Sequence, residues 1–95
     1  MINAETERPE DFPERLWGGF KRYVMNGIRP GQFLLAFFEG DFHELCRRGG
    51  KDLVMELWPA VVYLHNKCPI GCYGSEAHVK EWLSKGGLEG LQKEE

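Results

Sequence analysis

Apolar residues recur at intervals of three and four in several segments of the chain, and glycine or proline separates these segments. The first segment follows Asp11 and Pro13 and ends at Asn26-Gly27, with apolar positions at Leu16, Trp17, Phe20, Tyr23 and Val24. Such spacing places side chains on one face of a helix. Asp11 is a suitable N-cap, Pro13 fits a first helical turn, and Gly27 fits a helix end. We therefore expect a helix over residues 11–26.

A second helix is predicted to begin at Pro30, because a first helical position does not need the N–H that proline lacks. Residues 33–38 are apolar on every side, which is typical of the central, most buried helix of a domain. Glu39-Gly40-Asp41 interrupts this run, and the apolar stripe resumes at Phe42. Gly49-Gly50 predicts the end of the stripe.

Residues 51–66 form the third predicted helix. Its apolar positions share one broad face: Leu53, Val54, Leu57, Trp58, Val61 and Val62. Pro59 lies inside this segment, where proline removes a helical hydrogen bond and crowds the preceding turn. We therefore expect a kink or a break near Trp58. The run 60–64 would also suit a β-strand, but no partner strand is visible in the sequence.

A fourth helix is predicted after a loop over residues 68–74. Ser75 is a suitable N-cap, Glu76 favours the first turn, and Lys85-Gly86-Gly87 marks the end. The chain is thus expected to form a compact, single, all-α domain of four to five short helices. Residues 1–10 are predicted to be a flexible acidic arm, residues 11–87 the helical domain, and residues 88–95 a loose tail.

Charge is unevenly distributed along the 95 residues. Fifteen acidic and twelve basic residues give a net charge of −3, which disfavours general nucleic-acid binding. Residues 15–38 nevertheless carry four bases and no acid: Arg15, Lys21, Arg22 and Arg29. No apolar run reaches the roughly 18 residues that a membrane span requires, and the acidic N-terminus does not resemble a secretory signal. The odd number of cysteines favours reduced thiols, so we expect a cytoplasmic protein.

The turn over residues 27–31 is the strongest candidate for a binding site. The first N–H groups of a helix lack internal partners and attract anions, and arginine side chains add forked donors. The candidate ligand-binding residues are Arg22, Tyr23, Gly27, Arg29, Gly31, Gln32 and Trp17. In this interpretation the arginines and the N–H groups hold a phosphate, and Tyr23 or Trp17 stacks on a base. The alternative is a helix hairpin whose arginines are only solvated. The segment is not a P-loop, because it has no Gly-Lys-Ser or Gly-Lys-Thr.

A second constellation has residue types that bind zinc, namely His65, Cys68, Cys72 and His78. The spacing matches no strong zinc-finger pattern, and no metal or other cofactor is expected. Pro69 and Gly71 form a turn that would also bring the two thiols together, so a labile disulfide stays open. The remaining alternative is a pair of buried loop cysteines beside two surface histidines.

The sequence predicts binding rather than catalysis. No nucleophile lies beside a base at a useful spacing, and neither Glu39 with Asp41 nor His43 with Glu44 defines a site. Aromatic residues are more numerous than a domain of this size easily buries. The surplus is expected to form an apolar patch, which favours a homo-oligomer or a protein partner.

Several short motifs resemble a set of small uncharacterised proteins encoded by tailed bacteriophages and prophages. The matching residues are Arg22-Tyr23-Val24, Gly27-Ile28, Pro30-Gly31, Phe33-Leu34, Asp41, Cys72, Gly74-Ser75, Val79 and Trp82-Leu83. The resemblance covers residues 16–83 and implies origin more than activity. Phage proteins of this size include anti-CRISPR-like inhibitors of host complexes and oligomeric sponges for the nucleotide signals of bacterial immunity.

Two functions are consistent with these features. The first is sequestration of a phosphorylated small molecule, such as a nucleotide signal, at the basic helix start. The second is a protein–protein inhibitor or adaptor that binds a host defence complex through surplus aromatic residues or the acidic arm. A virion accessory role is a third possibility.

Overall fold

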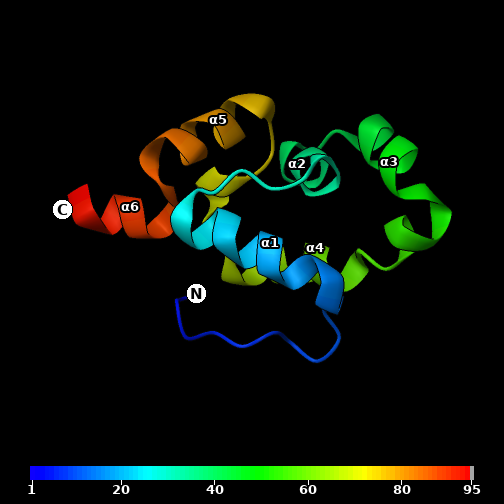
Figure 1. Ribbon diagram of the computed structural model, residues 1–95, viewed down its shortest axis with the longest axis horizontal. Helices are drawn as coiled ribbons and strands as arrows, with labels where there is room; N and C mark the ends of the chain where they lie inside the picture. Colours follow the sequence, from blue (N-terminus) through cyan, green and yellow to red (C-terminus); the bar gives the residue numbers. More distant parts are fainter. Residues whose placement is uncertain (95) are drawn as a thin grey trace.

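Residues 1–94 are described by the computed structural model and contain six α-helices, one 3₁₀ turn and no β-strand (Figure 1). The elements are α1 (Glu14–Asn26), α2 (Gln32–Glu39), α3 (Phe42–Met55), α4 (Trp58–Lys67), η1 (Ile70–Cys72), α5 (Glu76–Lys85) and α6 (Gly87–Glu94). The radius of gyration is 12.6 Å, close to the ~12 Å expected for a compact chain of this length. The predicted all-α class is confirmed, with six helices in place of four to five.

Glycines in the left-handed conformation end α1, α2 and α5. They are Gly27, Gly40 and Gly86, with φ angles of 64°, 75° and 81°. The predicted end of the first helix is thus confirmed. The predicted starts of the first two helices are wrong. Pro13 occupies the cap position of α1, and Gly31, in extended backbone, caps α2, so both helices begin after the residues that the sequence suggested.

Asp11 does not cap α1 because its neighbour Phe12 is drawn into the core. Phe12 is 1% exposed, and its N–H donates to the Pro9 carbonyl in a turn that ends before the helix starts. Ser75, by contrast, caps α5 as predicted, since its hydroxyl accepts the N–H of His78 at 3.1 Å.

Glycine and proline act differently in the middle of the chain. The end predicted at Gly49-Gly50 is confirmed in part, because Gly50, with φ 69° and ψ 178°, is not helical and divides α3 into two helical stretches joined by a kink. Pro59 lies in the first turn of α4, where its missing N–H has no helical partner to lose. The break predicted near Trp58 is therefore confirmed.

Aromatic side chains from α1 and α2 fill the core. Phe20 is fully buried, and its ring centroid lies 4.9 Å from that of Phe12 and 5.3 Å from that of Phe38. Five consecutive residues of α2, 34–38, are buried. The Trp82 indole of α5 donates to the carbonyls of Tyr23 (3.1 Å) and Val24 (3.2 Å), which ties α5 to the end of α1.

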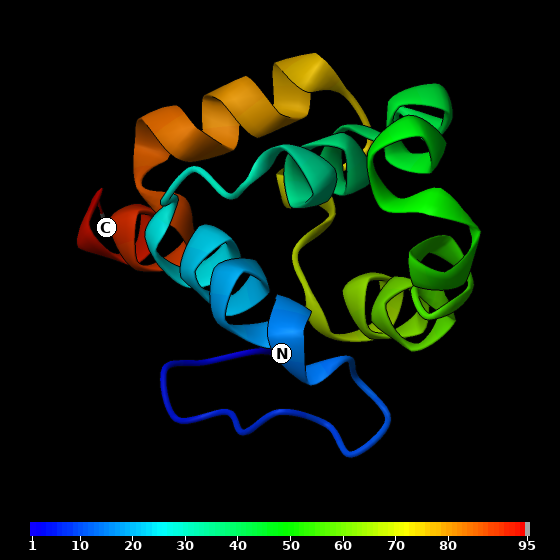
Figure 2. The same ribbon diagram turned by 45° about the vertical axis from the view of Figure 1, so that its right-hand side comes forward.

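The segment expected to be a loose tail is instead helical over residues 88–94, and Glu95 lies outside the described residues. The start of α6 packs on the end of α1 (Figures 1 and 2). A Cβ added at Gly27 would lie 2.6 Å from the Gly87 nitrogen, so only glycine allows this approach. Asn26 Nδ2 also donates to Glu89 at 2.7 Å. Apart from Gly90, residues 88–94 are good helix formers, so a local helix signal was present, and the contact with α1 adds to it.

The first residues pack against the domain as a strap instead of extending from it as an arm. Ile2 is 2% exposed, and its N–H donates to the Lys67 carbonyl at 2.8 Å. The Lys21 ammonium donates to the carbonyls of Ala4 and Thr6, both at 2.8 Å. Figure 2 shows this strap running below α1. One of the four bases of the basic stretch is therefore used to hold the strap.

Candidate functional site

The predicted anion site at the turn between α1 and α2 is only partly assembled. Gly31 and Gln32 lie exposed at the start of α2, with no side chain capping its N–H groups. Gly27 instead serves the helix end and the contact with α6, as its left-handed conformation and its distance from Gly87 show. At Gly27 the turn therefore has the structural role expected of a helix hairpin. At the start of α2, the first N–H groups have no side-chain partner.

Arg22 and Arg29 are both exposed, but they have different surroundings. The guanidinium of Arg22 lies over Gly18, with Nη1 3.2 Å from the position of an added Cβ. It lines a hollow of about 270 Å³ together with Lys21, Asn26 and Glu89. Arg29 does not line this hollow, and its charge acts instead on Glu39. The pKa of Glu39 is raised by burial and by the neighbouring acids Glu76 and Asp41, and Arg29 opposes that rise.

The two residues predicted to stack on a base are engaged in the core. Tyr23 is fully buried, and its hydroxyl donates to the Cys72 carbonyl at 2.7 Å. Burial, followed by the nearby Cys72 and Glu39, raises the pKa of Tyr23 above its ordinary value. Trp17 is half-buried and packs edge-on against Phe12 and Tyr63, at centroid distances of 5.1 and 5.7 Å. The stacking prediction for Tyr23 is wrong because the core occupies its ring, and the same packing engages the ring of Trp17.

The zinc candidates do not form a metal site. Among residues 1–94, no three or more His, Cys, Asp or Glu side chains are grouped to hold a metal ion. His65 pairs with the Tyr73 hydroxyl at 3.2 Å, and His78 lies exposed on α5. Cys68 and Cys72 are buried free thiols, and burial raises the pKa of Cys72 to about 12. The alternative of two buried cysteines beside two surface histidines is confirmed, since Cys68 and Cys72 are buried and His65 and His78 are exposed.

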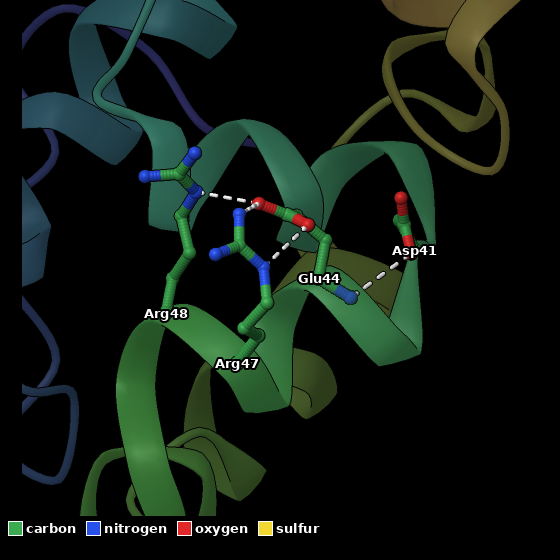
Figure 3. Close-up of polar contacts among 4 residues, drawn as sticks. All are labelled: Asp41, Glu44, Arg47 and Arg48. Atoms are coloured by element: carbon green, nitrogen blue, oxygen red, sulfur yellow. Dashed lines mark hydrogen bonds and ion pairs between the residues drawn. The ribbon is translucent and has the colours of Figure 1, made fainter.

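The acidic residues at the start of α3 have structural roles (Figure 3). The Asp41 carboxylate accepts the N–H of Glu44 at 3.1 Å and so caps the helix. Glu44 accepts from Arg47 Nη2 and Arg48 Nε, both at 2.6 Å. Hydrogen bonds from Arg47 and then Arg48 lower the pKa of Glu44 to about 2. Glu44 thus holds two arginines side by side on the outer surface of α3.

Exposed large apolar side chains gather on α3 and α4, the two helices on the right-hand side of Figure 2. No residue of the 14-residue α3 is buried, although apolar side chains mark one of its faces. Between α2, α3 and α4 lies a groove of about 350 Å³, lined by Phe37, Phe42, Leu45, Val61, Leu64 and Tyr73. Phe42 is 66% exposed at its edge. A groove with this lining is suited to apolar side chains.

A second apolar hollow, of about 370 Å³, lies where α3 bends at Gly50. Cys46, Lys51, Val54 and Met55 line it, and Met55 is 70% exposed. Trp58, which begins α4 three residues later, is also 70% exposed. We refer to the surface formed by Phe42, Cys46, Met55, Trp58, Val61 and Val62 as the α3–α4 face.

The sequence contained a signal for this face that was not assigned to it. The surplus of aromatic residues predicts an apolar patch, but helical spacing assigns Trp58, Val61 and Val62 to the same helix face as Leu53 and Leu57. Only Leu57 of these is buried. The break before Pro59 changes the direction of the chain and turns the remaining residues outward. The helical spacing of apolar residues, counted as if residues 51–66 were one helix, does not reveal this change.

Comparisons with other proteins place no known activity on this face. No family model, no curated protein and no solved structure matches the chain. Within residues 1–94, no helix has both the length and the apolar character needed to cross a membrane. Functional assignment therefore rests on the geometry of the described residues.

Proposed function

We propose that this chain is a non-enzymatic protein-binding module whose α3–α4 face docks on another polypeptide. The observation that carries the proposal is α3 itself. No residue of α3 is buried: Leu45 and Leu53 are only partly covered by the core, and Phe42 and Met55, near its two ends, are 66% and 70% exposed. Exposed apolar patches of this kind usually mark a protein interface.

The side chains of this face have the properties of interface anchors. Tryptophan and other aromatic residues contribute a large share of binding energy when they enter a desolvated pocket. Trp58 and Phe42 protrude, and the groove beside Phe42 offers an apolar pocket. On the resemblance to phage proteins, the role of such a module is that of an inhibitor or adaptor in the infected cell.

Sedimentation of the labelled protein tests this proposal, both alone in buffer and in host-cell extract. The wild type should sediment faster than an 11.0 kDa monomer in at least one of the two conditions. Trp58→Ser should remove the faster species, since it deletes the largest exposed anchor. Ile70→Ser is the matched control, because Ile70 is 82% exposed on η1, outside the α3–α4 face. A monomer in both conditions, or a complex insensitive to Trp58→Ser, contradicts the proposal.

A second candidate function is anion binding beside the strap. It is supported by the hollow of about 270 Å³ at Lys21 and Arg22, although Glu89 also lines it and Lys21 is bonded to the strap. Calorimetric titration with a cyclic dinucleotide and with ATP tests it. Arg22→Ala should weaken binding about tenfold, with marked dependence on salt, whereas Arg29→Ala and Arg47→Ala, both outside the hollow, should not. Unchanged binding in Arg22→Ala would remove this site.

A further inference from the structure

The α3–α4 face combines protruding anchors and hollows. On α4, Trp58, Val61, Val62 and His65 follow each other at spacings of three, one and three residues, which places them on one side of the helix. On α3, Phe42, Cys46 and Gly50 recur every four residues and connect the groove to the hollow at the bend. A surface that carries both a projection and a cavity can be complementary to itself.

The exposed apolar area is close to what a protein dimer requires. Phe42 is 66%, Trp58 70%, Met55 70% and Val62 40% exposed. With ordinary side-chain areas these four residues present about 400 Å² of apolar surface. A standard interface buries about 800 Å² per partner, of which somewhat more than half is apolar. One copy of this face therefore supplies most of the apolar share of one side of such an interface.

The charge of α3 permits two copies to approach. The whole chain has a net charge of −3, which makes most of the surface repel a second copy. The net charge of α3 is +1, because it contains two acidic residues, Glu44 and Asp52, and three basic residues, Arg47, Arg48 and Lys51. The pairs of Arg47 and Arg48 with Glu44 reduce the field of this helix further. The apolar face thus lies on the part of the molecule where self-repulsion is small.

We propose that the α3–α4 face binds the same face of a second copy, related by a twofold axis. Trp58 and Phe42 of each copy then enter the groove or the bend hollow of the other. This inference rests on the proposed function and names the partner as the chain itself. The working unit is a dimer that presents two identical straps and two identical α5–α6 sides.

Sedimentation equilibrium of the purified protein alone, up to about 100 µM, tests this inference. We expect a species of twice the 11.0 kDa mass, with a dissociation constant raised at least tenfold by Trp58→Ser or Phe42→Ser. Ile70→Ser should leave the constant unchanged. Circular dichroism of each variant confirms that the helices persist, since all three side chains are exposed in the monomer.

The reactivity of Cys46 locates the interface. Cys46 is the exposed thiol, whereas Cys68 and Cys72 are buried. In the dimer, maleimide should label Cys46 at least tenfold more slowly than in dilute monomer. A dimer in which Cys46 reacts at the monomer rate, or a protein that stays monomeric in buffer, overturns the inference. A monomer in buffer that forms a Trp58-dependent complex in extract would overturn only the inference and leave the proposed function standing.

Discussion

The side of the molecule built from α1, α2 and α5 and the side built from α3 and α4 use aromatic residues in opposite ways. In the first, Phe20, Tyr23 and Phe38 are fully buried and contact one another or their neighbours at centroid distances of 4.0 to 5.3 Å. In the second, Phe42 and Trp58 are mostly exposed. The contrast shows that aromatic content alone does not identify a core.

Polar contacts follow the same division. On the first side, buried donors find backbone acceptors, as with the Tyr23 hydroxyl on Cys72 and the Trp82 indole on Tyr23. On the second side, Arg47 and Arg48 pair with Glu44 on the surface of α3, and such exposed ion pairs contribute little to stability. Buried hydrogen bonds therefore fix the first side more firmly than surface ion pairs fix the second.

Replacing a phenylalanine on each side should show the largest difference. Phe20→Ala leaves a cavity in the core and should lower the free energy of unfolding by about 3–5 kcal/mol. Phe42→Ala removes an exposed ring and should change it by less than about 0.5 kcal/mol when the protein is dilute enough to be monomeric. Urea denaturation followed by circular dichroism measures both. Equal losses would show that Phe42 belongs to the core.

Two glycines with similar φ should respond differently to alanine. Gly27 has φ 64° and ψ 32° and lies against Gly87, whereas Gly40 has φ 75° and ψ 21° and an added Cβ there would meet only the Gly74 carbonyl, at an ordinary 3.6 Å. Gly40→Ala carries only backbone strain, about 1–3 kcal/mol. Gly27→Ala adds a clash, so we expect a further loss of about 1–3 kcal/mol. Thermal unfolding of the two variants compares them, and a smaller loss at Gly27 would contradict the close packing of α6.

Alkaline pH should destabilise the fold through the buried thiol of Cys72 in η1. Burial raises the pKa of Cys72 from 9.0 to about 12, so between these values the unfolded chain releases a proton that the folded chain retains. The free energy of unfolding should therefore fall by about 1.4 kcal/mol per pH unit for this group as the pH rises above 9. Cys72→Ala should make the decline shallower, and Cys46→Ala, at an exposed site, should not. A slope that is the same in all three proteins would show that Cys72 ionises freely in the folded state.

Local signals in the sequence were sufficient for much of the fold. The all-α class, the end of α1 at Gly27, the break before Pro59 and the Ser75 cap follow from backbone chemistry that acts over one helical turn. The start of α2 and the uncapped Asp11 were mispredicted because proline and aspartate are each compatible with several positions near a helix start.

Features that depend on distant residues were not predictable in the same way. The helix α6 packs through Gly87 on the end of α1, and Ile2 is buried beside Lys67. Tyr23 looked available for a ligand because helical spacing does not show that its hydroxyl reaches Cys72. The α3–α4 face was anticipated only as a surplus of aromatic residues, since its location depends on how α3 bends at Gly50.

The hydrogen bond from Ile2 to Lys67 joins two residues far apart in the chain. Contacts of high sequence separation are costly in chain entropy and slow to form, whereas the helices that surround them depend on neighbours only a few residues away. The strap can find its acceptor only after α4 has taken up its place. Its amide protons should consequently be among the last to gain protection from hydrogen exchange during refolding, and the strap is then the segment that reports completion of the native structure.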